Sequence, residues 1–116
     1  MNASISVLRS NWPYGVAPAV FRKLAVLFEA TPGISSVWIY GSRGRGDHRD
    51  ESDLDLAIDM PDGSFSRLAN AIDDLELIYP VDVVHWQSLM SDSFRQRIER
   101  DRKLFWQPAA KIARAT

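Results

Sequence analysis

The sequence predicts an α/β fold in which helices flank a small mixed β-sheet. Stretches 18–30, 64–77 and 91–101 carry apolar residues at the three- and four-residue spacing of amphipathic helices. Short runs rich in β-branched and aromatic residues alternate with them, as is typical of strands. A length of 116 residues is that of one domain. This alternation therefore predicts helices packed on a single sheet.

The composition is that of an ordinary soluble protein, with 46% hydrophobic and 25% charged residues. A net charge of −1 gives no field that would draw the chain to nucleic acid or to a membrane. The absence of cysteine excludes disulfides and thiolate metal sites and suits a cytoplasmic protein. The N-terminus does not resemble a signal peptide, and no apolar run approaches the roughly 18 residues of a membrane span. We therefore expect a cytoplasmic protein that acts without a membrane or nucleic acid.

The first half of the chain opens with residues 1–17, which we expect to form an N-terminal arm or loop with a turn at Pro13. A helix over 18–30 follows, ended by a Thr-Pro-Gly sequence. Residues 34–40 are expected to form the first strand. A second strand over 53–58 alternates apolar and acidic residues, so its leucines share one face.

The second half begins with a turn at 60–63 and a helix over 64–77, for which Ser64 is the expected N-cap. A Tyr-Pro pair ends this helix, and a third strand covers 81–86. A crossover helix between the second and third strands would allow these strands to run in parallel.

The last helix covers 91–101, and we interpret its row of arginines as a solvated face. A short final strand at 103–106 closes the domain, which we expect to span 18–106. Residues 107–116 are expected to form a loose tail.

Two carboxylates open the second strand, at Asp53 and Asp55. Residues two apart on a strand point to the same face, about 6.6 Å apart along the strand. Oxygen ligands without cysteine or clustered histidine favour Mg²⁺, with Mn²⁺ as the other candidate. Such a pair can hold two ions for in-line phosphoryl displacement.

A third carboxylate, Asp82, stands in the middle of an apolar strand, where an unpaired charge is costly. If its strand lies beside the second one, Asp82 joins Asp53 and Asp55. The alternative is that Asp82 pairs with an arginine. We favour the metal site because a Gly-Ser pair and an Asp-x-Asp pair accompany it.

The pair Gly41-Ser42 ends the first strand. Glycine lets a backbone approach a ligand closely, and Ser42 can start a short helix whose free N–H groups bind an anion. Arg43 and Arg45, in the loop that follows, are candidates to clamp phosphate oxygens. The Gly-Ser pair alone is a weak signal, and its value comes from the predicted strands before and after it.

The polar neighbours have simpler interpretations. Asp59 shares the parity of the two carboxylates but is expected to be a strand-end residue. His48 and Arg49 are expected to face solvent, and His85 to be a structural histidine of the third strand.

The pattern of Gly41-Ser42, then Asp53-Leu54-Asp55 and later Asp82, resembles the polymerase-beta-like nucleotidyltransferase superfamily. By length it is similar to the minimal nucleotidyltransferases, which are the antitoxins of HEPN/MNT toxin–antitoxin pairs. The resemblance covers residues 20–106 and implies the nucleotidyltransferase fold.

By this resemblance, Gly41 and Ser42 hold the β- and γ-phosphates of ATP, and Asp53 and Asp55 bind two Mg²⁺ ions. Asp82 completes the metal site and helps to deprotonate the incoming hydroxyl. Larger relatives carry an extra domain for their acceptor, for which we expect no room in 116 residues, so the acceptor should arrive on a partner protein. The resemblance implies that this partner is a HEPN toxin and that one of its tyrosines receives AMP.

Two other functions remain open. The chain could be a catalytically silent antitoxin that covers its partner, with exposed Trp12, Tyr14, Trp86 or Trp106 as anchors. A nucleic-acid enzyme acting alone is disfavoured by the net charge and by the lack of an aromatic–basic stripe. Because homo-oligomers are common among proteins, a homo-oligomer is a further expectation.

Overall fold

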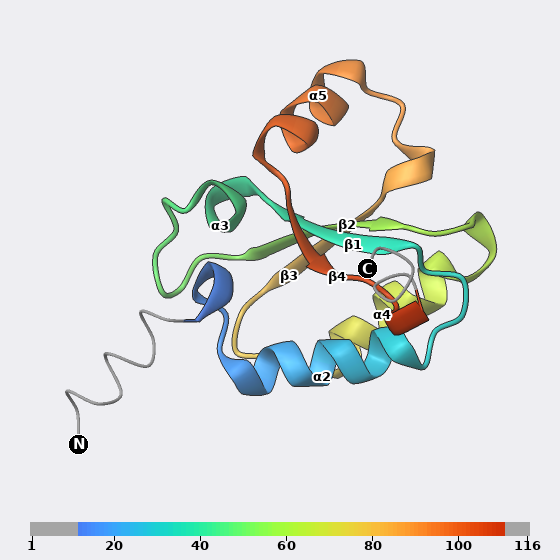
Figure 1. The fold of residues 1–116 in the computed structure, drawn as a ribbon, viewed down its shortest axis with the longest axis horizontal. Coiled ribbons are helices and arrows are strands. Elements are labelled where there is room, and N and C mark those ends of the chain that lie inside the picture. Colours follow the sequence, from blue (N-terminus) through green and yellow to red (C-terminus); the bar gives the residue numbers. More distant parts are fainter. Residues whose placement is uncertain (1–11, 111–116) are drawn as a thin grey trace.

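The computed structural model describes residues 12–110, which form a mixed four-stranded sheet in the order β3-β2-β1-β4 (Figure 1). At its centre, β2 (Leu54–Asp59) runs antiparallel to β1 (Ser36–Tyr40) and parallel to β3 (Val81–His85). At the other edge, β4 (Lys103–Trp106) pairs antiparallel with β1. The predicted fold class and the predicted parallel pair are both confirmed.

Helices cover both faces of this sheet. In Figure 1, α2 (Pro18–Glu29) and α4 (Phe65–Asp74) lie on one face, and α5 (Asp92–Asp101) lies on the other. The short helix α3 (Gly41–Arg45) follows β1 directly. Three single-turn 3₁₀ segments complete the described chain: η1 (Pro13–Gly15), η2 (Asp62–Ser64) and η3 (Trp86–Ser88).

The main core lies between the sheet and the helices α2 and α4. Leu54, Leu56 and Ile58 point into it and are 0% exposed, as their alternation with acidic residues predicts. From α2, the apolar stripe of Val20, Leu24 and Phe28 is buried against them. The acidic members of β2 therefore face the opposite side of the sheet.

The helix ends differ from the predictions mainly in α4. α4 ends at Asp74 rather than at residue 77, because Glu76 takes a left-handed backbone conformation with φ of 50°. Ser64 does occupy the N-cap position, but its side chain makes no capping hydrogen bond. In contrast, Ser91 caps α5 by accepting a hydrogen bond of 3.3 Å from the amide of Phe94.

The strands also start or stop within two residues of their predicted limits. β1 begins at Ser36 instead of residue 34, and β2 begins at Leu54, one residue later than predicted. β3 ends at His85, because Trp86 already belongs to the η3 turn.

Both predicted terminal segments lie partly outside the described residues, which exclude 1–11 and 111–116. The described end of the N-terminal segment packs with the domain, since Val16 is 2% exposed and belongs to the main core. At the other end, residues 109–110 are helical rather than irregular. Within the described chain, no helix has the length and apolar character needed to cross a membrane.

Candidate functional site

The parallel pairing of β2 and β3 brings the predicted carboxylates together. Asp55 and Asp82 are direct partners in the register of the two strands. Asp53 immediately precedes β2 and has the same parity as Asp55. Asp53 and Asp82 are exposed and Asp55 is half-buried, so all three can be reached from one face of the sheet.

These carboxylates are not neutralised. Among residues 12–110, no hydrogen bond or ion pair involves Asp53, Asp55 or Asp82, so the alternative in which Asp82 pairs with an arginine is not supported. Burial raises the pKa of Asp55 to about 6, and the like charges of Asp82 and Asp53 add to the rise while Arg45 opposes it. The site therefore holds repulsion that a bound cation would relieve.

Gly41 fits against this group in a way that only glycine allows. Its φ of 68° is left-handed, and a Cβ atom there would overlap the Oδ2 atom of Asp55. The helix α3 begins at this residue, one position before the predicted start at Ser42. The Gly-Ser pair thus lies beside Asp55, as the sequence pattern predicts for a phosphate cradle.

Tyr40 is a neighbour that the sequence analysis did not single out. It is the register partner of Asp55 on β1, and its ring meets the ring of Phe94 edge-on at 6.0 Å. Burial, followed by the negative charges of Asp55 and Asp82, raises the pKa of its hydroxyl to about 12. Its parity and its position directly before Gly41 could have identified it as a wall of the site.

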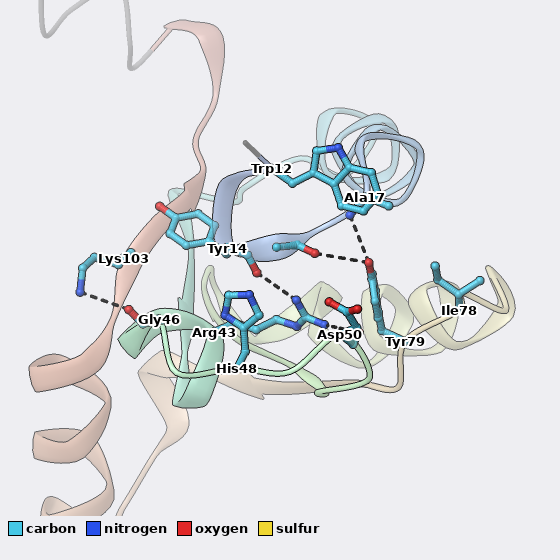
Figure 2. A pocket seen from close by; sticks show the side chains of 12 residues that line it. Trp12, Tyr14, Ala17, Arg43, Gly46, His48, Asp50, Ile78, Tyr79 and Lys103 are labelled. Carbon is cyan, nitrogen blue, oxygen red and sulfur yellow. Dashed lines mark hydrogen bonds between the residues drawn. The ribbon is translucent and has the colours of Figure 1, made fainter. Parts of the chain in front are cut away.

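Arg43 does not lie where the sequence analysis expected it. The side chain is 1% exposed, and its guanidinium donates to the backbone carbonyls of Tyr14, Arg49, Asp50 and Ser52. Figure 2 shows this guanidinium beside Tyr14 and Asp50. It also stacks on the ring of Tyr79 at 4.5 Å. The prediction that Arg43 clamps phosphate is therefore wrong, because its guanidinium is buried and is already held by main-chain carbonyls and by the Tyr79 ring.

Arg45 remains near the site but is held by carboxylates. Its Nε donates to Asp47 at 3.1 Å, and its Nη1 donates to the buried Asp101 at 3.2 Å. Asp101 ties α3 to the end of α5, where Gly44 also packs so closely that a Cβ would lie 2.7 Å from the carbonyl oxygen of Asp101. The sequence pattern does not identify Asp101, because nothing in an arginine-rich helix marks one of its acidic residues as buried.

Two predictions for nearby residues are confirmed. Asp59 ends β2 and accepts a hydrogen bond of 2.8 Å from Gln87. His85 is buried, and its two ring nitrogens contact the Ser88 hydroxyl at 2.6 Å and the Met60 carbonyl at 2.5 Å. His85 is therefore a structural histidine.

The prediction that His48 faces solvent is wrong. Its Nδ1 atom is buried and has no hydrogen-bond partner within the described chain. The neighbouring Arg49, in contrast, is exposed as predicted.

The donor chemistry fits a divalent cation. Carboxylate oxygens on one face, without an internal counter-ion, are the ligands that Mg²⁺ or Mn²⁺ prefers. Across residues 12–110, however, no three acidic, histidine or cysteine side chains are already gathered into a metal-binding group.

Comparisons with known proteins agree with this fold. The family model "Polymerase beta, Nucleotidyltransferase" matches residues 22–109, whereas the search of curated proteins finds no match. One similar solved structure is described as a proposed minimal nucleotidyltransferase; it is 28% identical, with a TM-score of 0.56, over 81% of this chain and 97% of that chain.

Two further structures share the fold. A toxin–antitoxin with AMP-PNP is 23% identical, with a TM-score of 0.59, over 83% of this chain and 77% of that chain. A complex of a tri-AMPylated HEPN toxin from Shewanella oneidensis with an MNT antitoxin is 20% identical, with a TM-score of 0.55, over 82% of this chain and 76% of that chain. Because the family model spans most of its length, the chain belongs to the polymerase beta nucleotidyltransferase family.

Proposed function

We propose that this chain is a Mg²⁺-dependent nucleotidyltransferase that moves AMP from ATP to a hydroxyl group of a partner protein. The observation that carries the proposal is the register pairing of Asp55 with Asp82, beside Gly41 and on the same face as Asp53. These are the positions at which an acidic metal site and a phosphate cradle must meet for phosphoryl transfer.

Asp53, Asp55 and Asp82 would hold the metal, with Mn²⁺ as a substitute. A divalent ion bound there would supply Lewis-acid stabilisation of the phosphate oxygens. Gly41 and Ser42 would hold the β- and γ-phosphates at the start of α3. Pyrophosphate would then leave toward the Gly41-Ser42 side of the site.

In the transfer step, the acceptor oxygen bonds to the α-phosphorus while the bond from that phosphorus to the bridging oxygen of the β-phosphate breaks. Pyrophosphate carries away the electron pair of the broken bond, and Asp82 takes the proton of the acceptor hydroxyl. Asp82 suits this role because it is exposed at the edge strand β3. Positioning and charge stabilisation supply most of the rate enhancement.

For the acceptor, we propose a tyrosine of a HEPN-type toxin, which would make this chain an antitoxin of the cytoplasm. The similar structures support this choice, since one is a toxin–antitoxin with AMP-PNP and another contains a tri-AMPylated HEPN toxin. Self-association of the chain stays a prediction.

Intact-mass analysis tests the proposal. The chain is mixed with the protein product of its neighbouring gene, together with Mg²⁺ and each nucleoside triphosphate in turn. We expect the mass of AMP on the partner with ATP, and no addition with the Asp53→Asn/Asp55→Asn variant or with EDTA. Asp59→Asn is the matched control, because this carboxylate lies on the same strand but outside the acidic group.

The same experiment distinguishes catalysis from the alternative of a silent binding module. A stable complex without any mass change, under every nucleotide and metal, would refute catalysis. Transfer that persists in the double variant would instead refute the metal assignment.

A further inference from the structure

A cavity lies beside α3, and its lining differs from the acidic group. It is a cavity of about 590 Å³, and none of Asp53, Asp55 and Asp82 lines it. Figure 2 shows Trp12 at the top, His48 with Arg43 below it, and Tyr14 and Tyr79 on opposite sides, at the left and right. The exposed side chains of Asp50 and Lys103 also line it. A cavity of this volume accepts a small organic ligand.

The walls of this cavity are fixed in place. The Tyr79 hydroxyl accepts a hydrogen bond of 3.2 Å from the amide of Ala17, and the Tyr79 ring is covered by Arg43. The Tyr14 hydroxyl donates to the carbonyl of Leu104 at 2.7 Å. A ligand would therefore meet preformed aromatic surfaces and would not have to order them.

His48 supplies the observation that points to a ligand. Among residues 12–110, its Nδ1 is the one buried side-chain nitrogen or oxygen without a hydrogen-bond partner. The imidazole packs against Gly15, where any Cβ atom would overlap its Nε2, so the ring is held in position. A buried polar atom without a partner is costly, and a hydrogen bond from a bound molecule would satisfy it.

The charge of the cavity favours an anion. Arg43 and Lys103 are cationic and Asp50 is anionic, which leaves an excess of positive charge. Lys103 donates one hydrogen bond, at 3.3 Å, to the carbonyl of Gly44, and an ammonium group has two further donors to offer. These features match a heterocycle that carries a phosphate. The aromatic walls and the unsatisfied ring nitrogen suit the heterocycle, and the ammonium group of Lys103 suits the phosphate.

We propose that this cavity binds a nucleoside 5′-monophosphate as a second nucleotide site. Its base packs between the aromatic side chains and hydrogen-bonds to Nδ1 of His48, and its phosphate meets Lys103. The site goes beyond the proposed function and needs no transferase activity. Arg43 connects it to the acidic group, because this arginine donates both to Tyr14 in the cavity wall and to Ser52, the residue before Asp53.

The test measures the binding of AMP and of adenosine by isothermal titration calorimetry. The Asp53→Asn/Asp55→Asn protein is used without metal, so that the acidic group cannot hold a nucleotide through an ion. We expect one AMP per chain. His48→Ala should weaken AMP and adenosine by about tenfold, the loss expected for one hydrogen bond, whereas Lys103→Ala should weaken AMP alone.

Two further variants keep the result interpretable. His48→Asn retains a polar atom near the place of Nδ1 and should restore binding, and the exposed neighbour variant Arg49→Ala should bind as the parent does. No AMP binding in the parent protein would overturn the proposal. Binding that His48→Ala leaves unchanged would overturn it as well, as would equal competition by inorganic phosphate alone.

Discussion

The substitution Asp55→Asn should stabilise the metal-free protein while it removes the proposed activity. Burial raises the pKa of the Asp55 carboxyl from 3.8 to about 6, with additional repulsion from Asp82 and Asp53. At about 1.4 kcal/mol per pH unit, this rise corresponds to roughly 3 kcal/mol. Since Asp55 is only half-buried, we expect a gain of about 1–2 kcal/mol in the free energy of unfolding at pH 7.5.

The sign follows from proton binding. Folded Asp55 holds its proton up to about pH 6, whereas the unfolded chain releases it near pH 4. The folded wild type therefore loses stability as the pH rises through this window, and it recovers none of it above pH 6. Asparagine carries no charge, so the advantage of the variant should be absent below about pH 4 and complete above about pH 6.

Urea denaturation in EDTA at several pH values measures this difference. Asp59→Asn is the control, because Asp59 accepts a hydrogen bond from Gln87 and its substitution should bring no gain. Added Mg²⁺ should stabilise the wild type and not Asp55→Asn. An advantage that is absent at pH 7.5, or that does not change with pH, would refute the electrostatic reasoning.

Three other outcomes follow from the same geometry. Gly41→Ala should lower the free energy of unfolding by about 1–3 kcal/mol and should abolish the rise in melting temperature that Mg²⁺ brings. Gly63→Ala is the control, because a Cβ atom there has open space around it and should cause neither effect. Arg43→Lys should lower the free energy of unfolding, measured by chemical denaturation, by about 2–4 kcal/mol, because an ammonium cannot reach four carbonyls. The control Arg49→Lys should stay within about 0.5 kcal/mol of the wild type. The initial rate of AMP transfer should fall below about pH 6 as Asp55 takes up a proton, and a higher Mg²⁺ concentration should move this fall to lower pH; a flat profile would contradict it.

The placement of the acidic group could be predicted because it depends on local rules. The two-residue period of a strand puts Asp53 and Asp55 on the face opposite Leu54. The helix between the second and third strands allowed a parallel pairing, and that pairing sets Asp55 beside Asp82.

Arg43 and His48 could not be predicted, because long-range contacts decide their roles. An arginine in a glycine-rich loop looks like a phosphate ligand until the fold brings the carbonyl of Tyr14, 29 residues earlier, to its guanidinium. His48 is likewise covered by Gly15, a contact that no local pattern encodes. Arg45 shows the same limit, since its partner Asp101 lies 56 residues away.

The end of α4 shows a different limit. Apolar residues continue at helical spacing to residue 77, but the backbone reverses at Glu76, where φ is 50°. Helical period alone cannot reveal a single left-handed residue other than glycine. Leu77 still packs against the main core, so the apolar pattern reported burial correctly and secondary structure incorrectly.

The buried guanidinium of Arg43 has a consequence for how this loop can evolve. It binds main-chain oxygens at positions 49, 50 and 52, and these oxygens are present whatever side chain each position carries. The loop can therefore exchange its surface residues freely, and so adapt to different partners, while its path and the position of the adjoining carboxylate stay the same. Arg43 itself cannot be exchanged in this way, so related chains should vary around a fixed arginine.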